Sequence, residues 1–97
     1  MSKLDHILAT LRDHKADLQS HFNVKSIGVF GSFVRGQDTK LSDVDILIEL
    51  SEPIGLIQFI QLENKIGRFL KKKVDLVMKS ALKPKIGQRI LKEVIYV

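Results

Sequence analysis

The spacing of three short apolar runs constrains the fold of this chain more than any other feature of its sequence. The runs cover residues 24–30, 44–50 and 74–78, and they are rich in the residues that favour strands. Only 13 residues separate the first run from the second, which is short for a parallel crossover and sufficient for an antiparallel return. A helical apolar pattern over about residues 56–70 separates the second run from the third, and this is the length of a parallel crossover. The spacing therefore predicts a small mixed sheet.

Helical patterns flank the three predicted strands. Apolar residues recur at helical spacing between residues 4 and 18, so we expect an amphipathic helix over about residues 3–20, with Ser2 as its N-cap and Asp5 as a weak capping-box partner. A last helix is expected from Pro84 to about Glu93, because proline suits the first helical turn. No repeat or Pro/Ser-rich linker interrupts the 97 residues. We therefore predict one α+β domain over residues 1–97, with the order α-β-α-β-α-β-α.

Composition and charge limit the classes of function. The chain contains no cysteine, which excludes disulfides, Cys-based zinc sites and thiol nucleophiles. The longest stretch without a charge is the ten residues between Glu52 and Glu63, and acidic residues interrupt the N-terminal region, so we expect neither a membrane span nor a signal peptide and place the chain in the cytoplasm. The formal net charge is +5, and residues 71–97 hold eight basic and two acidic side chains. This basic end favours an anionic partner, although a solvated basic surface explains it equally well.

Two carboxylates stand at the start of the second predicted strand. Asp43 and Asp45 are two residues apart, so in a strand their side chains project from the same face, about 6.6–6.8 Å apart along the chain. Two anions on one face are unfavourable without a cation, which makes a shared metal site one interpretation. The other is that acidic residues stand at a strand entrance by chance, and the pair alone does not decide between them.

A Gly-Ser pair follows the first predicted strand. Gly31 allows the backbone to approach a ligand closely, and the local amides with the Ser32 hydroxyl can hold phosphate oxygens if a short helix begins at Phe33. The spacing of Gly31 and Gly36 matches the glycines of a Walker A loop. That motif is excluded, because residues 37–38 are Gln-Asp where Lys and Ser or Thr are required.

The predicted topology brings these residues together. An antiparallel return places Gly31 and Ser32 beside Asp43 and Asp45, and a parallel pairing of the second and third runs places Asp45 beside Asp75. Three carboxylates and a phosphate-holding turn then converge at one edge of the sheet. This arrangement is typical of two-metal phosphoryl or nucleotidyl transfer.

The whole pattern resembles the polymerase β-like nucleotidyltransferase superfamily. The resemblance rests on Gly31-Ser32, ten further residues, the Asp43-x-Asp45 pair, and Asp75 in a later Val-Asp-Leu-Val strand. The short length and the segments Gly-Ser-Phe-Val-Arg-Gly and Ser-Asp-Val-Asp-Ile-Leu-Ile are most similar to the minimal nucleotidyltransferases of the MntA type, which are typically antitoxin partners of HEPN-domain toxins. The resemblance covers nearly the whole chain and implies the nucleotidyltransferase fold.

The resemblance also implies roles for the matching residues. Gly31 and Ser32 would grip the triphosphate of ATP. Asp43, Asp45 and Asp75 would bind two Mg²⁺ ions, and Asp75 would help to deprotonate the acceptor hydroxyl. Oxygen ligands of this kind suit Mg²⁺, which carboxylates and substrate phosphates hold together.

Two features of the sequence, Arg35 and the segment 54–62, are each consistent with two interpretations. Arg35 either contacts phosphate as a nucleotide-binding residue or pairs with Asp38 to brace the turn, and the second role is slightly favoured. The segment 54–62 has six large apolar residues in nine, more than one packed helix face needs. It is equally well explained by burial in the core and by an interface with a partner or a second copy.

The implied function is Mg²⁺-dependent transfer of AMP from ATP to a protein hydroxyl. The catalytic core accounts for the 97 residues, so a partner must present the acceptor, and the resemblance suggests a tyrosine of a HEPN toxin, which makes the chain an antitoxin. One alternative is a non-catalytic antitoxin that neutralises its partner by binding. Another is a transferase acting on a small molecule or an RNA end, for which the basic C-terminal third is mild support. Direct nucleic-acid binding is not favoured, and no membrane partner is expected.

Overall fold

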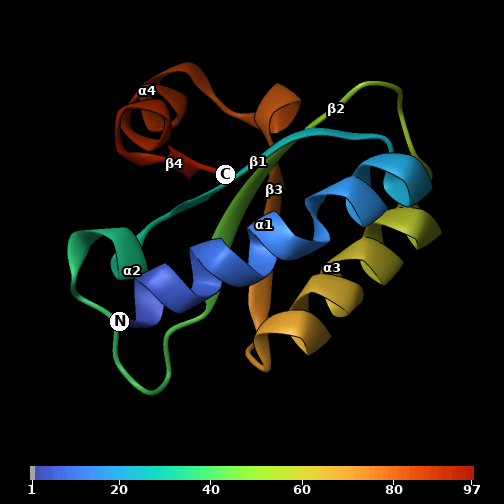
Figure 1. Ribbon diagram of the computed structural model, residues 1–97. Helices are drawn as coiled ribbons and strands as arrows, with labels where there is room; N and C mark the ends of the chain where they lie inside the picture. Colours follow the sequence, from blue (N-terminus) through green and yellow to red (C-terminus); the bar gives the residue numbers. More distant parts are fainter. Residues whose placement is uncertain (1) are drawn as a thin grey trace.

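The computed structural model describes residues 2–97 and contains one sheet with helices around it. The strands lie in the order β3-β2-β1-β4. Figure 1 shows α1 and α3 side by side on the sheet, with α4 apart from them. The helices are α1 (Lys3–Phe22), α2 (Ser32–Arg35), α3 (Leu56–Leu70) and α4 (Pro84–Glu93); the strands are β1 (Val24–Phe30), β2 (Val44–Leu50), β3 (Val74–Met78) and β4 (Ile95–Tyr96); a 3-10 turn, η1 (Lys79–Ala81), follows β3. The predicted α+β class and helix–strand order are confirmed, and β4 is an element that the sequence pattern did not predict.

The strand pairing agrees with the predicted topology. β1 and β2 are antiparallel, with Phe30 opposite Asp45. β2 and β3 are parallel, with Asp45 opposite Asp75. The end of β1 and the starts of β2 and β3 therefore meet at one end of the sheet, and both predicted pairings are confirmed.

Strand β4 pairs with β1 because β1 contains Gly28. A Cβ at Gly28 would lie only 2.7 Å from Cγ2 of Val94, so no other residue leaves room for the last residues of the chain without a shift. Gly28 stands opposite Tyr96 in the antiparallel register. One residue later, Val97 donates its N–H to the carbonyl oxygen of Ile27 at 3.0 Å. The C-terminal segment thus continues the sheet at the free edge of β1.

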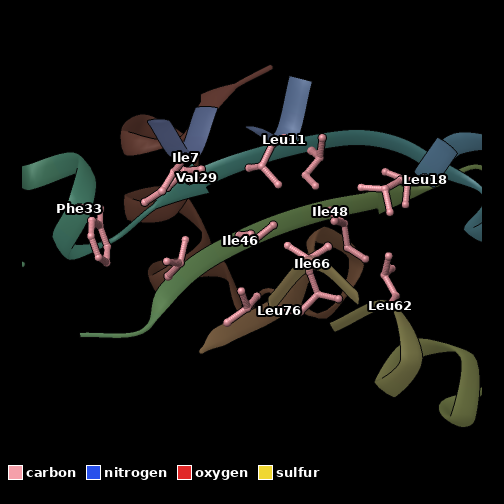
Figure 2. Packing of buried hydrophobic residues seen from close by; sticks show 14 residues of the cluster. Ile7, Leu11, Leu18, Val29, Phe33, Ile46, Ile48, Leu62, Ile66 and Leu76 are labelled. Carbon is pink, nitrogen blue, oxygen red and sulfur yellow. The ribbon is translucent and has the colours of Figure 1, made fainter. Parts of the chain in front are cut away.

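The core lies between the sheet and the helices α1 and α3. Leu11 and Leu18 of α1, Ile46 and Ile48 of β2, and Ile66 of α3 are completely buried. Figure 2 shows these side chains gathered around β2. Each fully buried aliphatic side chain contributes about 1.5–3 kcal/mol of transfer free energy, so the interlocking of α1, α3 and β2 makes the centre of the sheet the most stable part of the fold.

The helices begin where the sequence signals predict. The Oγ atom of Ser2 accepts the N–H of Asp5 at 3.1 Å, and Asp5 in turn accepts the N–H of Ser2 at 3.2 Å, which completes the predicted capping box. Pro84 occupies the first turn of α4. Within residues 2–97, none of the helices combines the length and apolar character that a bilayer crossing requires.

The apolar segment 54–62 is divided between the core and the surface. Leu62 is completely buried and Phe59 packs against the core. Three other side chains are exposed: Leu56 and Ile57 at 74% each, and Ile60 at 47%. Burial in the core therefore accounts for part of this segment, and the interface interpretation of the rest stays a prediction. We call the three exposed residues the α3 patch.

Candidate functional site

The candidate site is a cavity at the end of the sheet where β1 stops and β2 and β3 begin. Its volume is about 440 Å³. One side, which we call the strand wall, consists of Phe30, Gly31, Arg35 and Asp45. The other side, the helix wall, belongs to α4 and includes Ile86, Arg89 and Glu93. The cavity therefore joins the motif residues at the end of the sheet to the C-terminal helix.

Gly31 and Asp45 are in direct contact at the strand wall. Gly31 has a φ angle of 83°, in the region that favours glycine. A Cβ at this position would lie 2.9 Å from Cγ of Asp45 and closer still to one of its carboxylate oxygens. Glycine is thus required both by the backbone conformation and by the neighbouring carboxylate, and the predicted proximity of the Gly-Ser turn to Asp45 is observed.

Asp45 is a carboxylate whose charge is only partly compensated by the protein. Burial raises the pKa of this half-buried carboxyl, and the nearby negative charges of Asp75 and Asp43 raise it further, while the charge of Arg35 opposes them. Within residues 2–97, no hydrogen bond lowers the pKa of Asp45. Ionisation of Asp45 therefore costs more in the folded protein than in the unfolded chain, and a bound cation would offset that cost.

The other two predicted metal ligands, Asp43 and Asp75, lie near Asp45, but the three side chains do not converge on a common metal position. Asp43 is in the loop just before β2, and Asp75 is exposed on β3. Among residues 2–97, no three His, Cys, Asp or Glu side chains come close enough to form a ready-made metal cluster. The chemistry of the donors still fits Mg²⁺, because all three are carboxylates and the charge of Asp45 is only partly compensated. The structure thus brings Asp43, Asp45 and Asp75 to one end of the sheet as candidate ligands.

The Gly-Ser turn leads directly into a short helix. Ser32 is the first residue of α2, one residue earlier than the predicted start at Phe33, and the N–H groups of Val34 and Arg35 both donate to the carbonyl oxygen of Gly31 at 3.1 Å. Ser32 is half-buried and is not one of the residues that line the cavity. It lies next to the strand wall through its neighbour Gly31.

Arg35 pairs with Glu93, and the expected pairing with Asp38 is wrong. The Nη1 atom of Arg35 lies 2.7 Å from Oε1 of Glu93. Gly36, with a φ angle of 70°, ends α2 and turns the chain away from it, so that Asp38 lies 3.8 Å from Lys3 instead. Arg35 does line the cavity, which keeps it among the candidate nucleotide-binding residues.

Glu93 is a site residue that the sequence pattern did not predict. Its Oε2 atom accepts the N–H of Gly31 at 2.7 Å. Burial alone would raise the pKa of Glu93, but the hydrogen bonds from Gly31 and Arg35, together with the charge of Arg89, outweigh it and lower the pKa. No local motif marks this residue, because one acid at the end of a basic helix has no distinctive spacing.

Comparison with known proteins gives a consistent result. Residues 11–97 match a family model described as a nucleotidyltransferase domain. The protein adenylyltransferase MntA of Thermococcus cleftensis is 47% identical to this chain over 97 residues, which cover 100% of this chain and 98% of that protein.

Solved structures share the fold over most of the chain. A structure assigned to the minimal nucleotidyltransferases superposes with a TM-score of 0.73 at 30% identity, covering 91% of this chain and 93% of that chain. A chain from the complex of a tri-AMPylated HEPN toxin with an MNT antitoxin of Shewanella oneidensis superposes with a TM-score of 0.61 at 21% identity, covering 97% of this chain and 68% of that chain. At this identity the second likeness establishes the fold alone.

Proposed function

Because the chain belongs to the nucleotidyltransferase domain family, we propose that it transfers AMP from ATP to a tyrosine hydroxyl of a partner HEPN toxin and thereby acts as an antitoxin. The observation that carries the proposal is the position of Asp45, a partly compensated carboxylate held between Gly31 and Asp75 at a cavity. An ionised carboxyl group with a raised pKa reduces the stability of the folded state, and such groups are typical of functional sites. We take residues 1–97 as one minimal nucleotidyltransferase domain acting in the cytoplasm.

In this proposal the strand wall and the adjoining turn hold the triphosphate. The Ser32 hydroxyl donates a hydrogen bond to a phosphate oxygen, and the Gly31 turn brings the backbone close to it. An arginine has five N–H donors. Arg35 directs two of them to Glu93 and Gln37, so further donors remain for a phosphate. Hydrogen bonds between a guanidinium and a phosphate are charge-assisted and therefore among the stronger ones.

The three carboxylates are proposed to hold two Mg²⁺ ions. When bound, such ions neutralise the charge of the triphosphate and lower the pKa of the acceptor hydroxyl. In the transfer step, the acceptor oxygen forms a bond to the α-phosphorus and the bond from that phosphorus to pyrophosphate breaks. The proton of the hydroxyl passes to Asp75, which is exposed and therefore accessible to an acceptor from outside the chain.

The proposed acceptor belongs to another protein. The relative from Thermococcus cleftensis is a protein adenylyltransferase, which supports a protein as the acceptor. In the Shewanella complex the HEPN toxin is the AMPylated molecule, which supports a toxin as that protein. The exposed α3 patch offers apolar surface of the kind that protein partners bury. A partner that docks and presents one hydroxyl would supply the orientation on which much of the rate depends.

The decisive experiment combines the purified protein with a HEPN-domain toxin, ATP and Mg²⁺. We expect AMP adducts on the toxin by intact-protein mass spectrometry, located on a tyrosine by peptide mapping. Small hydroxyl compounds should be modified far more slowly, because their attack is not oriented. Asp43→Asn is the control and should produce no adduct. A folded wild-type protein that modifies no partner protein under these conditions would contradict the proposal.

The same variant tests the alternative of neutralisation by binding alone. We expect the Asp43→Asn variant to bind the toxin and to leave the toxin's activity largely intact in cells. If this variant forms no adduct and still neutralises the toxin fully at equal expression, transfer is not what makes the protein an antitoxin. Labelled AMP found on an RNA end instead of on the toxin would favour the remaining alternative.

A further inference from the structure

We propose that Glu93 is a positioning residue of the nucleotide site, which ties α4 to the strand wall and holds Arg35 in the orientation that meets the nucleotide phosphates. The inference rests on the proposed function, because it adds a residue to the same site. It is carried by the two hydrogen bonds of Glu93, by the register of β4 and by the exposure of α4.

The register of β4 explains why Glu93 meets Gly31. Val29 stands opposite Ile95 in the antiparallel pairing of β1 with β4. Two residues further along this register, Gly31 stands opposite Glu93, where α4 has already replaced the strand. The Ile27 carbonyl faces the C-terminal segment, and alternate residues of a strand direct their backbone groups to the same neighbour. The N–H of Gly31 therefore points to α4, and the Glu93 carboxylate replaces the missing strand carbonyl at 2.7 Å.

The second oxygen of the same carboxylate fixes Arg35. Its Nη1 atom donates to Oε1 of Glu93 at 2.7 Å, and its Nε atom donates to Oε1 of Gln37 at 3.1 Å. The guanidinium is a rigid plane, so two bonds at different nitrogens determine its orientation. The Arg35 side chain is nevertheless 44% exposed, and the residue lines the cavity. Its remaining donors are thus available to a ligand in a predetermined direction.

Helix α4 has little else to hold it over the cavity. Gly87 is its only buried residue among those described, while Ile86 is 59% exposed and Leu91 is 44% exposed. Two kinds of contact join the last turn of α4 to the strand wall. One is the pairing of β4, which follows the helix, and the other is the pair of bonds from Glu93 to Gly31 and Arg35. Loss of Glu93 therefore removes the side-chain link between the last turn of α4 and the strand wall, and it removes one of the two hydrogen bonds that orient Arg35.

An alternative role for Glu93, in which its carboxylate occupies a phosphate position, predicts the opposite effect on nucleotide binding and can be distinguished by experiment. The donors that hold the Glu93 carboxylate, an amide N–H and a guanidinium, also bind phosphate oxygens. If Glu93 merely occupied the place of a phosphate, its removal would strengthen nucleotide binding. If Glu93 positions Arg35, its removal weakens binding. The position of Gly31 in the sheet register favours the second role.

The test measures ATP affinity by calorimetry, and KM and kcat for transfer to the toxin, in wild type, Glu93→Ala and Glu93→Gln. We expect Glu93→Ala to raise the Kd and KM for ATP about ten- to a hundredfold, with a smaller change in kcat. Glu93→Gln should be intermediate, because its amide oxygen still accepts the Gly31 N–H while the charge opposite Arg35 is lost. In a double-mutant cycle, Glu93→Ala should add little to Arg35→Ala.

Two control variants and a ligand-free measurement accompany the test. Glu52→Gln removes the same charge from an exposed position after β2, at the far end of that strand, and Gln88→Ala changes an exposed residue of α4; both should leave ATP affinity unchanged. All assays are run at a temperature where circular dichroism shows each variant folded. In NMR spectra without nucleotide, the Gly31 amide proton should shift upfield in Glu93→Ala, which tests the contact itself.

The outcomes separate failure of the inference from failure of the proposed function. Unchanged or tighter ATP binding by Glu93→Ala, or effects of Glu93→Ala and Arg35→Ala that simply add, would overturn the positioning role while wild-type transfer remained. A wild-type protein that binds no nucleotide would overturn the proposed function together with this extension of it. In that case neither the wild type nor the control variants would bind nucleotide.

Discussion

Asp45 and Glu93 face the same cavity from opposite walls, yet the protein treats their charges in opposite ways. Burial raises the pKa of Asp45, and the neighbouring acids Asp75 and Asp43 raise it further. Burial also acts on Glu93, but the N–H of Gly31 and the guanidinium of Arg35 reverse its effect and lower the pKa. The chain more than offsets the effect of burial on Glu93, whereas for Asp45 the charge of Arg35 offsets it only in part.

The difference separates anchoring from chemistry within one site. The bonds of Glu93 join two segments of the fold, so its charge is used inside the protein. The charge of Asp45 has no such use and is available to a ligand of opposite sign. Carboxylates that need an external cation are the oxygen donors that Mg²⁺ sites are built from. The following predictions test this contrast, from the largest expected effect to the smallest.

Replacement of Asp45 by Asn should produce the largest loss of transfer. We expect the rate to fall at least about a hundredfold. The metal ions that the carboxylates would hold stabilise the charge of the transition state and so lower the barrier by several kcal/mol. The melting temperature should stay the same or rise, since a partly compensated anion is removed. Initial rates and thermal unfolding measure both effects, with Glu52→Gln as the charge-matched control. Near-normal transfer by Asp45→Asn would refute its assignment as a metal ligand.

Addition of Mg²⁺ should reveal which carboxylates meet the cation. In the presence of nucleotide, Mg²⁺ at about a hundred times its Kd should stabilise the wild-type protein by about 2.7 kcal/mol. Asp43→Asn and Asp45→Asn should gain much less, whereas Glu93→Gln should retain most of the gain. Thermal unfolding with and without EDTA provides the measurement. Equal stabilisation of the wild type and both Asp variants would place the ions elsewhere.

Replacement of Ser32 by Ala tests the turn beside Asp45. The loss of a hydrogen bond to a charged phosphate costs about 1.5–3 kcal/mol, so ATP affinity should fall about ten- to a hundredfold. The melting temperature should not change, because Ser32, the first residue of α2, is not part of the core. Calorimetry gives the affinity, and Ser80→Ala in η1 is the matched control. If both affinity and transfer are normal, Ser32 only shapes the turn.

The pH dependence of stability should separate the two carboxylates by sign. The folded-state pKa of Glu93 is lowered, so its contribution is present above the unfolded-state pKa and is lost as the pH falls through the folded-state value. The folded-state pKa of Asp45 is raised, so its ionisation reduces stability as the pH rises from the unfolded-state value to the folded-state value. At neutral pH, Asp45→Asn should therefore be more stable than wild type and Glu93→Gln less stable.

Urea denaturation at several pH values between about 3 and about 7 measures these changes. Both differences from wild type should shrink at the acidic end of the series, where the carboxyl groups are protonated in the folded state. Variants that differ from wild type in the same direction at neutral pH would contradict the opposite shifts.

Much of the strand wall could be predicted from the sequence. The 15-residue helix between β2 and β3 has the length of a parallel crossover, and in a parallel pair the equal positions of Asp45 and Asp75 in their strands place them side by side. The short connection after Phe30 favours an antiparallel return, which brings Gly31 to Asp45. These results follow from chain length and strand direction, and no detail of side-chain packing was needed.

The helix wall could not be predicted in the same way. Strand β4 has two residues, too few to show any periodicity, and its pairing depends on the space that Gly28 leaves beside Val94. The sequence slightly favours a pairing of Arg35 with Asp38, which would brace the turn, over a contact with phosphate. The actual partner, Glu93, is 58 residues away and reaches Arg35 only because β4 directs the end of α4 toward the strand wall.

The sequence by itself determined which segments form strands and helices, and which chemical groups stand at the strand ends. Apolar period, glycine position and connection length act between near neighbours in the chain, so they can be evaluated without the fold. The tertiary structure alone decided how far each carboxylate is compensated. The hydrogen bond between Gly31 and Glu93 joins residues 62 positions apart, and the partial compensation of Asp45 depends on every charge around it. Compensation of charge is a property of distances in space, and those exist only once β1, β2, β3 and β4 have assembled.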